Sequence, residues 1–167
     1  VRKLLEQVDA GLEAIIADES LNAVEKFEEF FWFINRWKID SKPFLIQTAR
    51  VLYQDQNVLL RYKMQKEAIK TYNSMLAAII EQGMVEGVFH VTYPLATAEV
   101  VLMIPRIFED TLIPFLISDE RDNEMLEHIQ QQIVVYSKSV ERVLGMTTAS
   151  LNLFSLDDLE AWLVDDK

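Results

Sequence analysis

The chain has 167 residues, of which 50% are hydrophobic and 26% are charged, and it contains no cysteine. This length and balance fit one folded domain, and the lack of cysteine excludes disulfides, thiolate metal sites and thiol catalysis. The net charge of −11 argues against nucleic-acid binding by the chain as given, because an acidic surface repels phosphate.

Glycine and proline occur only four times each. An all-β protein needs turn residues at short, regular intervals, so this scarcity predicts an all-α fold, a bundle of about six to seven helices over residues 1–167. The longest apolar runs are far too short to cross a bilayer, and no secretory signal opens the chain. We therefore expect a cytoplasmic protein without a membrane partner. A first residue that is Val, already in helical register, predicts a chain cut from something longer, with a mature processed protein as the alternative.

The first half of the chain predicts four helices. Apolar residues at helical spacing indicate a first helix up to Ala17 and a second that begins at Ser20 or Asn22. A short helix follows Ser41 and ends at residue 53 or 54. A long helix then covers residues 58–82, with Gly83 as its left-handed C-terminal cap.

The next helix begins at Pro94 and contains two further prolines, Pro105 and Pro114. Each proline removes an amide donor, so we expect a kink near Ile104 and a stop or second kink near Ile113.

The end of the chain predicts two more helices. The acidic stretch 118–124 begins a helix that ends at Gly145. Ser155 and Asp158 form a capping-box-like start for a short last helix. Its single apolar face would consist of Leu156, Leu159, Trp162 and Leu163.

Catalytic and metal-binding patterns are weak. Neither histidine has an acidic residue three positions before it, and His128 with Glu124 offers only one helical pair, without the further ligands that a metal needs. His90 lies in the joint between two helices, where a hydrogen-bonded loop residue and a ligand contact are both open readings. No nucleophile or phosphate-binding motif occurs. We expect no enzyme activity, no cofactor and no metal.

Aromatic residues are concentrated in the segment FEEFFWFINRW, residues 27–37. Successive residues of a helix point about 100° apart, so these rings cover more than one face. They pack either against the core and a second subunit, or around an apolar cavity for a small hydrophobic ligand. The predicted ligand-binding residues are Phe31, Trp32, Trp37, Tyr53, Tyr62, Tyr72, Met75 and Met103, with His90 as a polar contact.

The two helices after residue 93 are apolar on two faces. One face can pack within the chain and the other on a second copy, which predicts a homodimer built as a four-helix bundle. The predicted interface residues are Val100, Ile104, Ile107, Phe108, Ile129, Ile133, Tyr136 and Val140.

The long helix ending in IIEQG, the segment MVEGVFHV and the proline-initiated helix TYPLATAEVVLMI together resemble the C-terminal regulatory domain of TetR-family transcriptional repressors. The first two helices, RKLLEQVDAGLEAIIAD and SLNAVEKF, are also similar to that domain. The resemblance implies an effector-binding and dimerisation domain, with DNA bound only through an N-terminal helix-turn-helix domain that is missing here. The effector would shift the orientation of the DNA-binding heads through the first helix. The alternative is a freestanding helical adaptor that binds a protein partner.

Overall fold

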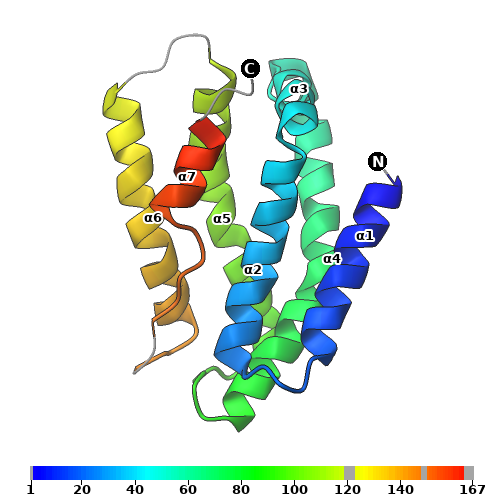
Figure 1. The fold of residues 1–167 in the computed structure, drawn as a ribbon, viewed down its shortest axis with the longest axis vertical. Coiled ribbons are helices and arrows are strands. Elements are labelled where there is room, and N and C mark those ends of the chain that lie inside the picture. Colours follow the sequence, from blue (N-terminus) through cyan, green and yellow to red (C-terminus); the bar gives the residue numbers. More distant parts are fainter. Residues whose placement is uncertain (1, 119–122, 148–149, 164–167) are drawn as a thin grey trace.

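The long helices run up and down and pack side by side in this computed structural model, which describes residues 2–118, 123–147 and 150–163, with side chains from residue 7 onward (Figure 1). The helices are α1 (Arg2–Ala17), α2 (Ala23–Asp40), α3 (Lys42–Leu52), α4 (Val58–Val85), α5 (Pro94–Ile117), α6 (Asn123–Val143) and α7 (Leu156–Leu163), with a 3-10 turn η1 at Asp55–Asn57. No strand occurs in these ranges, so the predicted all-α fold is confirmed.

Two helix starts form because side chains satisfy free backbone donors. At α2 the cap is Asn22, whose Oδ1 accepts from the N–H groups of Val24 and Glu25 at 3.0 Å each. The Glu25 carboxylate accepts in return from the Asn22 N–H at 2.9 Å, which completes a capping box. At α7 the Ser155 N–H donates to Asp158 at 2.7 Å, as the sequence predicted.

The α4–α5 joint differs from the prediction, because α4 continues past Gly83 to Val85. The left-handed residue is Gly87, at φ 74°, and the Val88 N–H donates to the Gly83 carbonyl at 2.9 Å in a Schellman pattern. Gly83 serves a different purpose: a Cβ there would lie 2.1 Å from the ring of Phe89, so glycine makes room for that ring.

The end of α6 matches its prediction. Gly145 has φ 65°, and the Met146 N–H donates to the Glu141 carbonyl at 3.0 Å. The predicted acidic start of this helix includes residues 119–122, which lie outside the described residues.

The predicted stop near Ile113 is wrong, because α5 remains one helix to Ile117. Its last turns are held by burial of Leu112, Phe115 and Leu116, which offsets the amide that Pro114 lacks. The kink near Ile104 and the alternative of a second kink near Ile113 stay predictions.

Two groups of buried side chains form the interior. The first group lies between α1, α2, α4, the α4–α5 joint, α5 and the C-terminal half of α6. Its members include Phe27, Phe30, Leu76, Ile80, Phe89 and Val140. The second lies between α5, α6 and α7, and consists of Phe108, Leu112, Phe115, Leu116, Ile129, Ile133, Leu159 and Trp162. Leu156 was predicted to share the face of Leu159 and Trp162, but it is 50% exposed.

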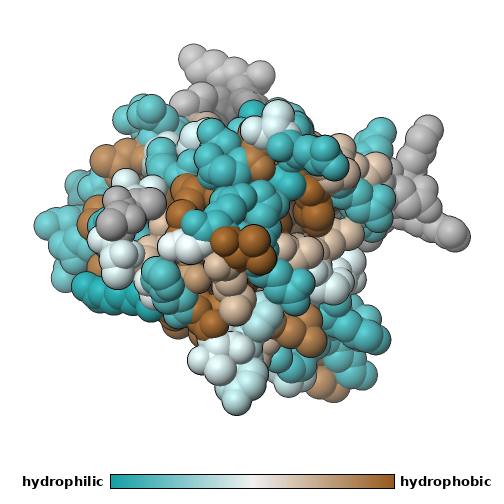
Figure 2. Space-filling view, turned by 90° about the horizontal axis from the view of Figure 1, so that it is seen from below, coloured by the Kyte–Doolittle hydropathy of each residue, from teal (hydrophilic) through white to brown (hydrophobic). Residues whose placement is uncertain are grey.

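Seen from the end where the α4–α5 joint lies, hydrophobic residues are interspersed among hydrophilic ones (Figure 2). Among the described residues, no helix is both long enough and apolar enough to cross a membrane.

Candidate functional site

An aromatic cluster holds α2 against α4. The ring of Phe30 contacts the rings of Phe31 and Tyr72, with centroids 5.4 and 6.4 Å apart. Phe27 lies edge-on to Phe89 of the α4–α5 joint, at 5.6 Å. Because positions 27, 30 and 31 share one face of α2, this face is inserted into the core, and aromatic pairs of this kind prefer tilted and edge-to-face arrangements.

The nine predicted ligand-binding residues fall into three groups. Four belong to the first buried cluster or pack against it: Phe31, Trp37, Tyr72 and Met75. Two are half-buried outside that cluster: Trp32 and Tyr53. Three are exposed: Tyr62, His90 and Met103. The structure therefore brings together the members from α2 and the second half of α4, and leaves the exposed three apart from them.

Two polar atoms next to this cluster are buried and have no hydrogen-bond partner among the described residues. They are the indole Nε1 of Trp37, on α2, and Oδ1 of Asn73, on α4. A buried polar group without a partner costs roughly 1–3 kcal/mol, so each would gain from a polar group brought by a ligand. Sequence reasoning selected Trp37 by ring size and missed Asn73, because nothing in its local pattern shows that its amide is buried.

A partly exposed ion pair joins α2 to α5. The Lys38 ammonium contacts the Glu109 carboxylate at 2.5 Å, and their side chains are 36% and 30% exposed. Burial alone would raise the pKa of Glu109, but the ammonium of Lys38 overcomes that effect and holds the pKa below its usual value. The carboxylate in turn adds to burial in raising the pKa of Tyr136.

Tyr53 joins α3 to α5 near the same region. Its hydroxyl donates to Asp110 at 3.3 Å, while the guanidinium of Arg61 lies 4.2 Å from its ring centroid. Burial and the charges of Asp110 and Glu109 raise its pKa, so this phenol stays protonated at neutral pH.

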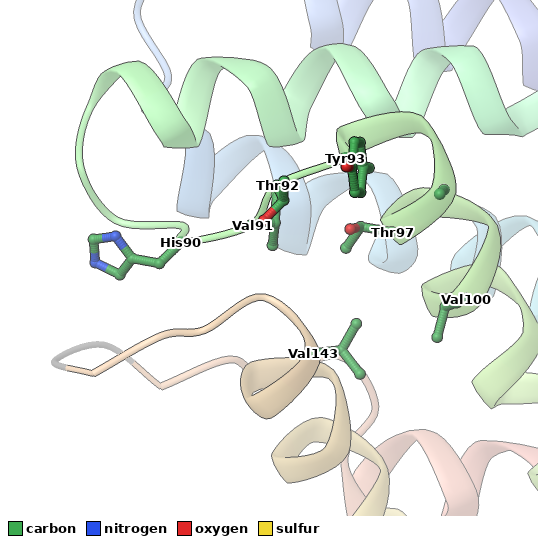
Figure 3. Close-up of a pocket in the computed structure, with 8 residues that line it drawn as sticks. His90, Val91, Thr92, Tyr93, Thr97, Val100 and Val143 are labelled. Atoms are coloured by element: carbon green, nitrogen blue, oxygen red, sulfur yellow. The ribbon is translucent and has the colours of Figure 1, made fainter.

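A shallow groove of about 280 Å³ lies at the α4–α5 joint (Figure 3). It is lined by His90, Val91, Thr92, Tyr93, Ala96, Thr97, Val100 and Val143. Of the predicted ligand-binding residues, only His90 lines it, and its imidazole lies at one end, directed away from Thr97 and Val100. The groove is open to solvent and contains no charged side chain, so it has little with which to select a ligand.

Residues 46–120 match the family model of the tetracyclin repressor-like C-terminal domain. This middle part of the chain is similar to the C-terminal domain of TetR-like proteins. The matched stretch contains most of α3, all of α4, the α4–α5 joint and α5, including the segments IIEQG, MVEGVFHV and TYPLATAEVVLMI; the first two helices, which also carry the resemblance, lie outside it. No curated protein and no solved structure matches the chain.

The outer surface of the helical bundle differs from the predicted interface. Five of the eight predicted residues are buried within the single chain: Phe108, Ile129, Ile133, Tyr136 and Val140. Ile104 is half-buried, and Val100 and Ile107 are 50% and 70% exposed. The helical periodicity located an apolar face of α6 correctly, but that face packs on α5 and on residues 150–163, which follow α6 in the chain.

Other apolar residues of α5 and α6 do lie on the surface. Met103, between Val100 and Ile107 on α5, is 45% exposed, and Val134 and Val135 on α6 are 65% and 60% exposed. Positions 100, 103 and 107 share one face of a helix, so the exposed residues of α5 form a stripe, which we call the outer stripe together with Val134 and Val135. In the sequence, the adjacent residues Val134 and Val135 indicate that α6 has exposed apolar residues. Neighbouring helical residues point about 100° apart, so one buried face cannot contain both side chains.

Proposed function

We propose that this TetR-like domain is the effector-binding and dimerisation domain of a transcriptional repressor. The observation that carries the proposal is the family match over residues 46–120. A DNA-binding module on the N-terminal side of α1 would contact the operator, which is compatible with a net charge of −11 on the domain itself. In the dimer, effector binding would change the relative orientation of the two DNA-binding modules through α1. We propose that this takes place in the cytoplasm.

The dimer is proposed to form through the outer stripe of α5 and α6. Exposed apolar side chains are costly to leave in water, and an isologous contact between two copies of α5 and α6 would bury those of the outer stripe in a four-helix bundle. This interface retains Val100 and Ile107 from the predicted set and replaces its buried members with Met103, Val134 and Val135.

Light scattering after size exclusion tests the dimer. Wild-type protein at micromolar concentration should have twice the mass of one chain, and Ile107→Glu should convert it to monomer, because a carboxylate would be buried at the interface. Val85→Glu is the matched control, because Val85 is 89% exposed at the end of α4, away from the stripe. A monomeric wild type, or a dimeric Ile107→Glu, would refute this part.

The effector is proposed to be a small aromatic or otherwise hydrophobic molecule that enters between α2 and α4. The rings of Phe31 and Tyr72 supply apolar contact area there, and Trp37 Nε1 and Asn73 Oδ1 supply one donor and one acceptor. Such a ligand needs an acceptor for the indole, so 2-naphthol and 1-naphthoic acid are suitable first probes.

Thermal denaturation with these probes tests the site. A ligand at 100 times its dissociation constant stabilises the native state by about 2.7 kcal/mol. Trp37→Phe should weaken the binding of an active probe roughly five- to tenfold, the value of one hydrogen bond. Trp32→Phe is the matched control, since Trp32 packs against neither buried cluster. Equal affinities for the two variants would place the site elsewhere.

The second candidate is a helical adaptor, and one observation favours it. The first turns of α4 expose Val58, Leu59, Leu60, Tyr62 and Met64, next to the basic residues of the same segment. An acidic, partly apolar protein segment would fit that surface. A wild type that is monomeric and does not respond to any aromatic probe would favour the adaptor over the regulator.

A further inference from the structure

The polypeptide after α6 returns along the bundle instead of leaving it. We call residues 150–163 the C-terminal arm; it ends in α7, which lies between α6 and α2 and in front of α5 (Figure 1). The arm contributes to both interior clusters: Leu151 and Leu153 are buried in the first, and Leu159 and Trp162 in the second. It therefore closes a gap that the other helices leave open.

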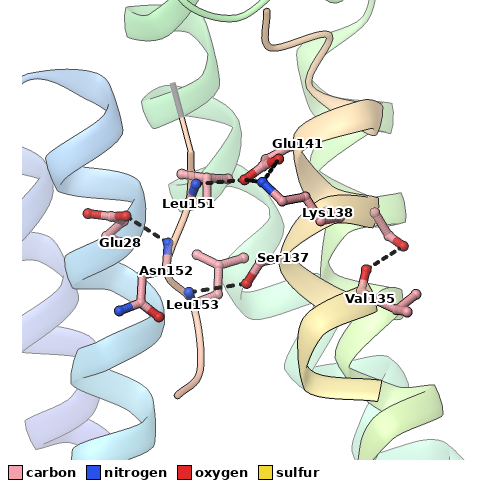
Figure 4. A network of polar contacts seen from close by, with 9 residues as sticks. Glu28, Val135, Ser137, Lys138, Glu141, Leu151, Asn152 and Leu153 are labelled. Atoms are coloured by element: carbon pink, nitrogen blue, oxygen red, sulfur yellow. Dashed lines mark hydrogen bonds and ion pairs between the residues drawn. The ribbon is translucent and has the colours of Figure 1, made fainter. Parts of the chain in front are cut away.

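The extended part of the arm is held by side chains on two different helices (Figure 4). The Leu151 N–H donates to Glu141 of α6 at 2.8 Å, and the Asn152 N–H donates to Glu28 of α2 at 2.8 Å. A weaker contact of 3.5 Å joins the Leu153 N–H to the Ser137 hydroxyl. Within the described ranges, no backbone–backbone hydrogen bond joins the arm to α2 or α6. Release of the arm thus leaves the hydrogen bonds of the neighbouring helices intact.

The apolar part of the arm fills a groove between two helix pairs. The floor of the groove is formed by buried residues of α5 and α6, with Phe108, Leu112, Phe115, Ile129 and Ile133 among them. Ile39, Leu45 and Ile46 from α2 and α3 form the opposite wall. Leu159 and Trp162 occupy the groove, with only 2% and 8% of their surface exposed. Without α7 this groove would be an open apolar site large enough for an indole and an isobutyl group.

The helix that fills the groove has little stability of its own. α7 has eight residues, and isolated helices shorter than about 12 residues are marginal in water. Its position therefore depends on the two buried side chains and the carboxylate contacts described above. Segments of this kind open locally at a fraction of the global unfolding free energy.

One basic group lies at the edge of the groove. The Lys42 ammonium, at the start of α3, donates to the Ala161 carbonyl in the last turn of α7 at 3.3 Å. Once α7 leaves, an anionic group could replace that carbonyl, and a charge-assisted contact is stronger than the one it replaces. This favours a ligand with a negative head over a neutral one.

We propose that the C-terminal arm is a displaceable plug over a second binding site, and that this site takes an apolar molecule with an anionic head, such as an aromatic or aliphatic acid. The apolar body replaces Leu159 and Trp162 in the groove, and the head group contacts Lys42. The site lies on the other side of α2 and α5 from the aromatic cluster of α2 and α4, and it requires neither the effector nor the dimer proposed above.

The test uses the full chain and the fluorescent probe 8-anilinonaphthalene-1-sulfonate, an aromatic anion. Leu159→Asp places a charge in the groove and expels α7, whereas Leu156→Asp places the same charge on the 50% exposed side of the same helix. The apparent affinity of a site is reduced by the fraction of open molecules, so removing the plug raises it. We expect at least tenfold tighter, saturable binding of one probe per chain to Leu159→Asp, and less than a twofold change for Leu156→Asp.

An unchanged affinity for Leu159→Asp, with a cooperative unfolding transition, overturns the proposal. So does binding that does not saturate, because that is typical of a loosened core. If Leu159→Asp does not fold, Glu28→Ala takes its place in the probe-binding test, because it removes only the acceptor of the Asn152 N–H. It should tighten probe binding at least threefold relative to Glu29→Ala, whose carboxylate pairs with Arg36 on the surface. Equal affinities for these two variants also overturn the proposal.

The anionic head is tested separately with the neutral probe N-phenyl-1-naphthylamine. In the Leu159→Asp background, or in Glu28→Ala if that variant is used, the anionic probe should bind more tightly than the neutral one. Lys42→Met should reduce this preference at least threefold. A preference that survives Lys42→Met removes the anionic head from the proposal and shows that Lys42 does not select the ligand.

Discussion

Gly83→Ala should destabilise this protein strongly, although alanine is the better helix former. Replacing glycine by alanine inside a helix normally stabilises it by about 1 kcal/mol. Here the new methyl group would lie 2.1–2.7 Å from three ring atoms of Phe89, far closer than carbon atoms approach. The ring is only 1% exposed and packs against Phe27, so it has no free volume to enter and must leave the core.

The size of the effect follows from these two terms. Loss of a buried phenylalanine side chain costs roughly 3–5 kcal/mol. After subtraction of the helix gain, we expect a net loss of about 2–4 kcal/mol in the free energy of unfolding. For a chain of this length that corresponds to a fall in Tm of roughly 5–15 °C.

Urea denaturation with a double-mutant cycle checks the mechanism. Phe89→Ala removes the ring, so Gly83→Ala should become neutral or stabilising in that background. Gly87→Ala is a useful contrast, because a Cβ at Gly87 meets nothing within 4 Å and its cost comes only from φ 74°, about 1–2 kcal/mol. If Gly83→Ala is harmless in the wild type, or equally costly without the ring, the steric explanation is refuted.

Three further outcomes follow from polar contacts. Asn22→Ala should cost about 1 kcal/mol in urea denaturation, because it removes the acceptor of the α2 capping box. Lys38→Met should cost about 1–2 kcal/mol by thermal denaturation, between the values for surface and buried pairs, because it leaves Glu109 half-buried without its cation. Burial would raise the pKa of Glu141, but Lys138 and the Leu151 N–H outweigh it and hold the pKa below that of an ordinary glutamate. Its contribution to arm closure is therefore fully present above the pKa of an ordinary glutamate and is lost as the pH falls through the lower folded pKa, so anionic-probe binding per chain should increase on acidification.

Local chemistry explains why most helices could be predicted from the sequence. The capping box at Asn22 and the reciprocal contact of Ser155 with Asp158 each involve residues three positions apart. Gly145 likewise ends α6 through contacts within one turn. Signals of this kind lie entirely within a short window of sequence, so they can be read without knowing what packs on the helix.

Features that depend on distant residues were not predictable in the same way. Gly83 and Gly87 are equivalent as sequence signals for a helix end, and only the position of Phe89 distinguishes them. Ile129 and Val140 belong to an apolar face of α6, but the sequence does not state whether that face meets the same chain or a second copy. For the same reason, the hydrogen bond from the Asn152 N–H to Glu28 could not be predicted from the local sequence, because the two residues are 124 positions apart.

The division of α6 into separate faces leads to one further expectation. Successive helical residues are about 100° apart, so Val135 points roughly 120–160° away from the arm-holding residues Ser137 and Glu141, whereas Val134 points only about 20–60° away from them. Val135 therefore lies on another side of α6 than the arm contact, and Val134 lies on the same side as Glu141, so the part of the proposed dimer contact that is separate from the arm is the one made by Val135 and the residues of α5. Leu159→Asp, which releases the arm, should leave the mass measured by light scattering equal to that of the wild type. A shift to monomer in that variant would show that the arm supports the dimer, and the two proposed sites would then have to be treated as one coupled unit.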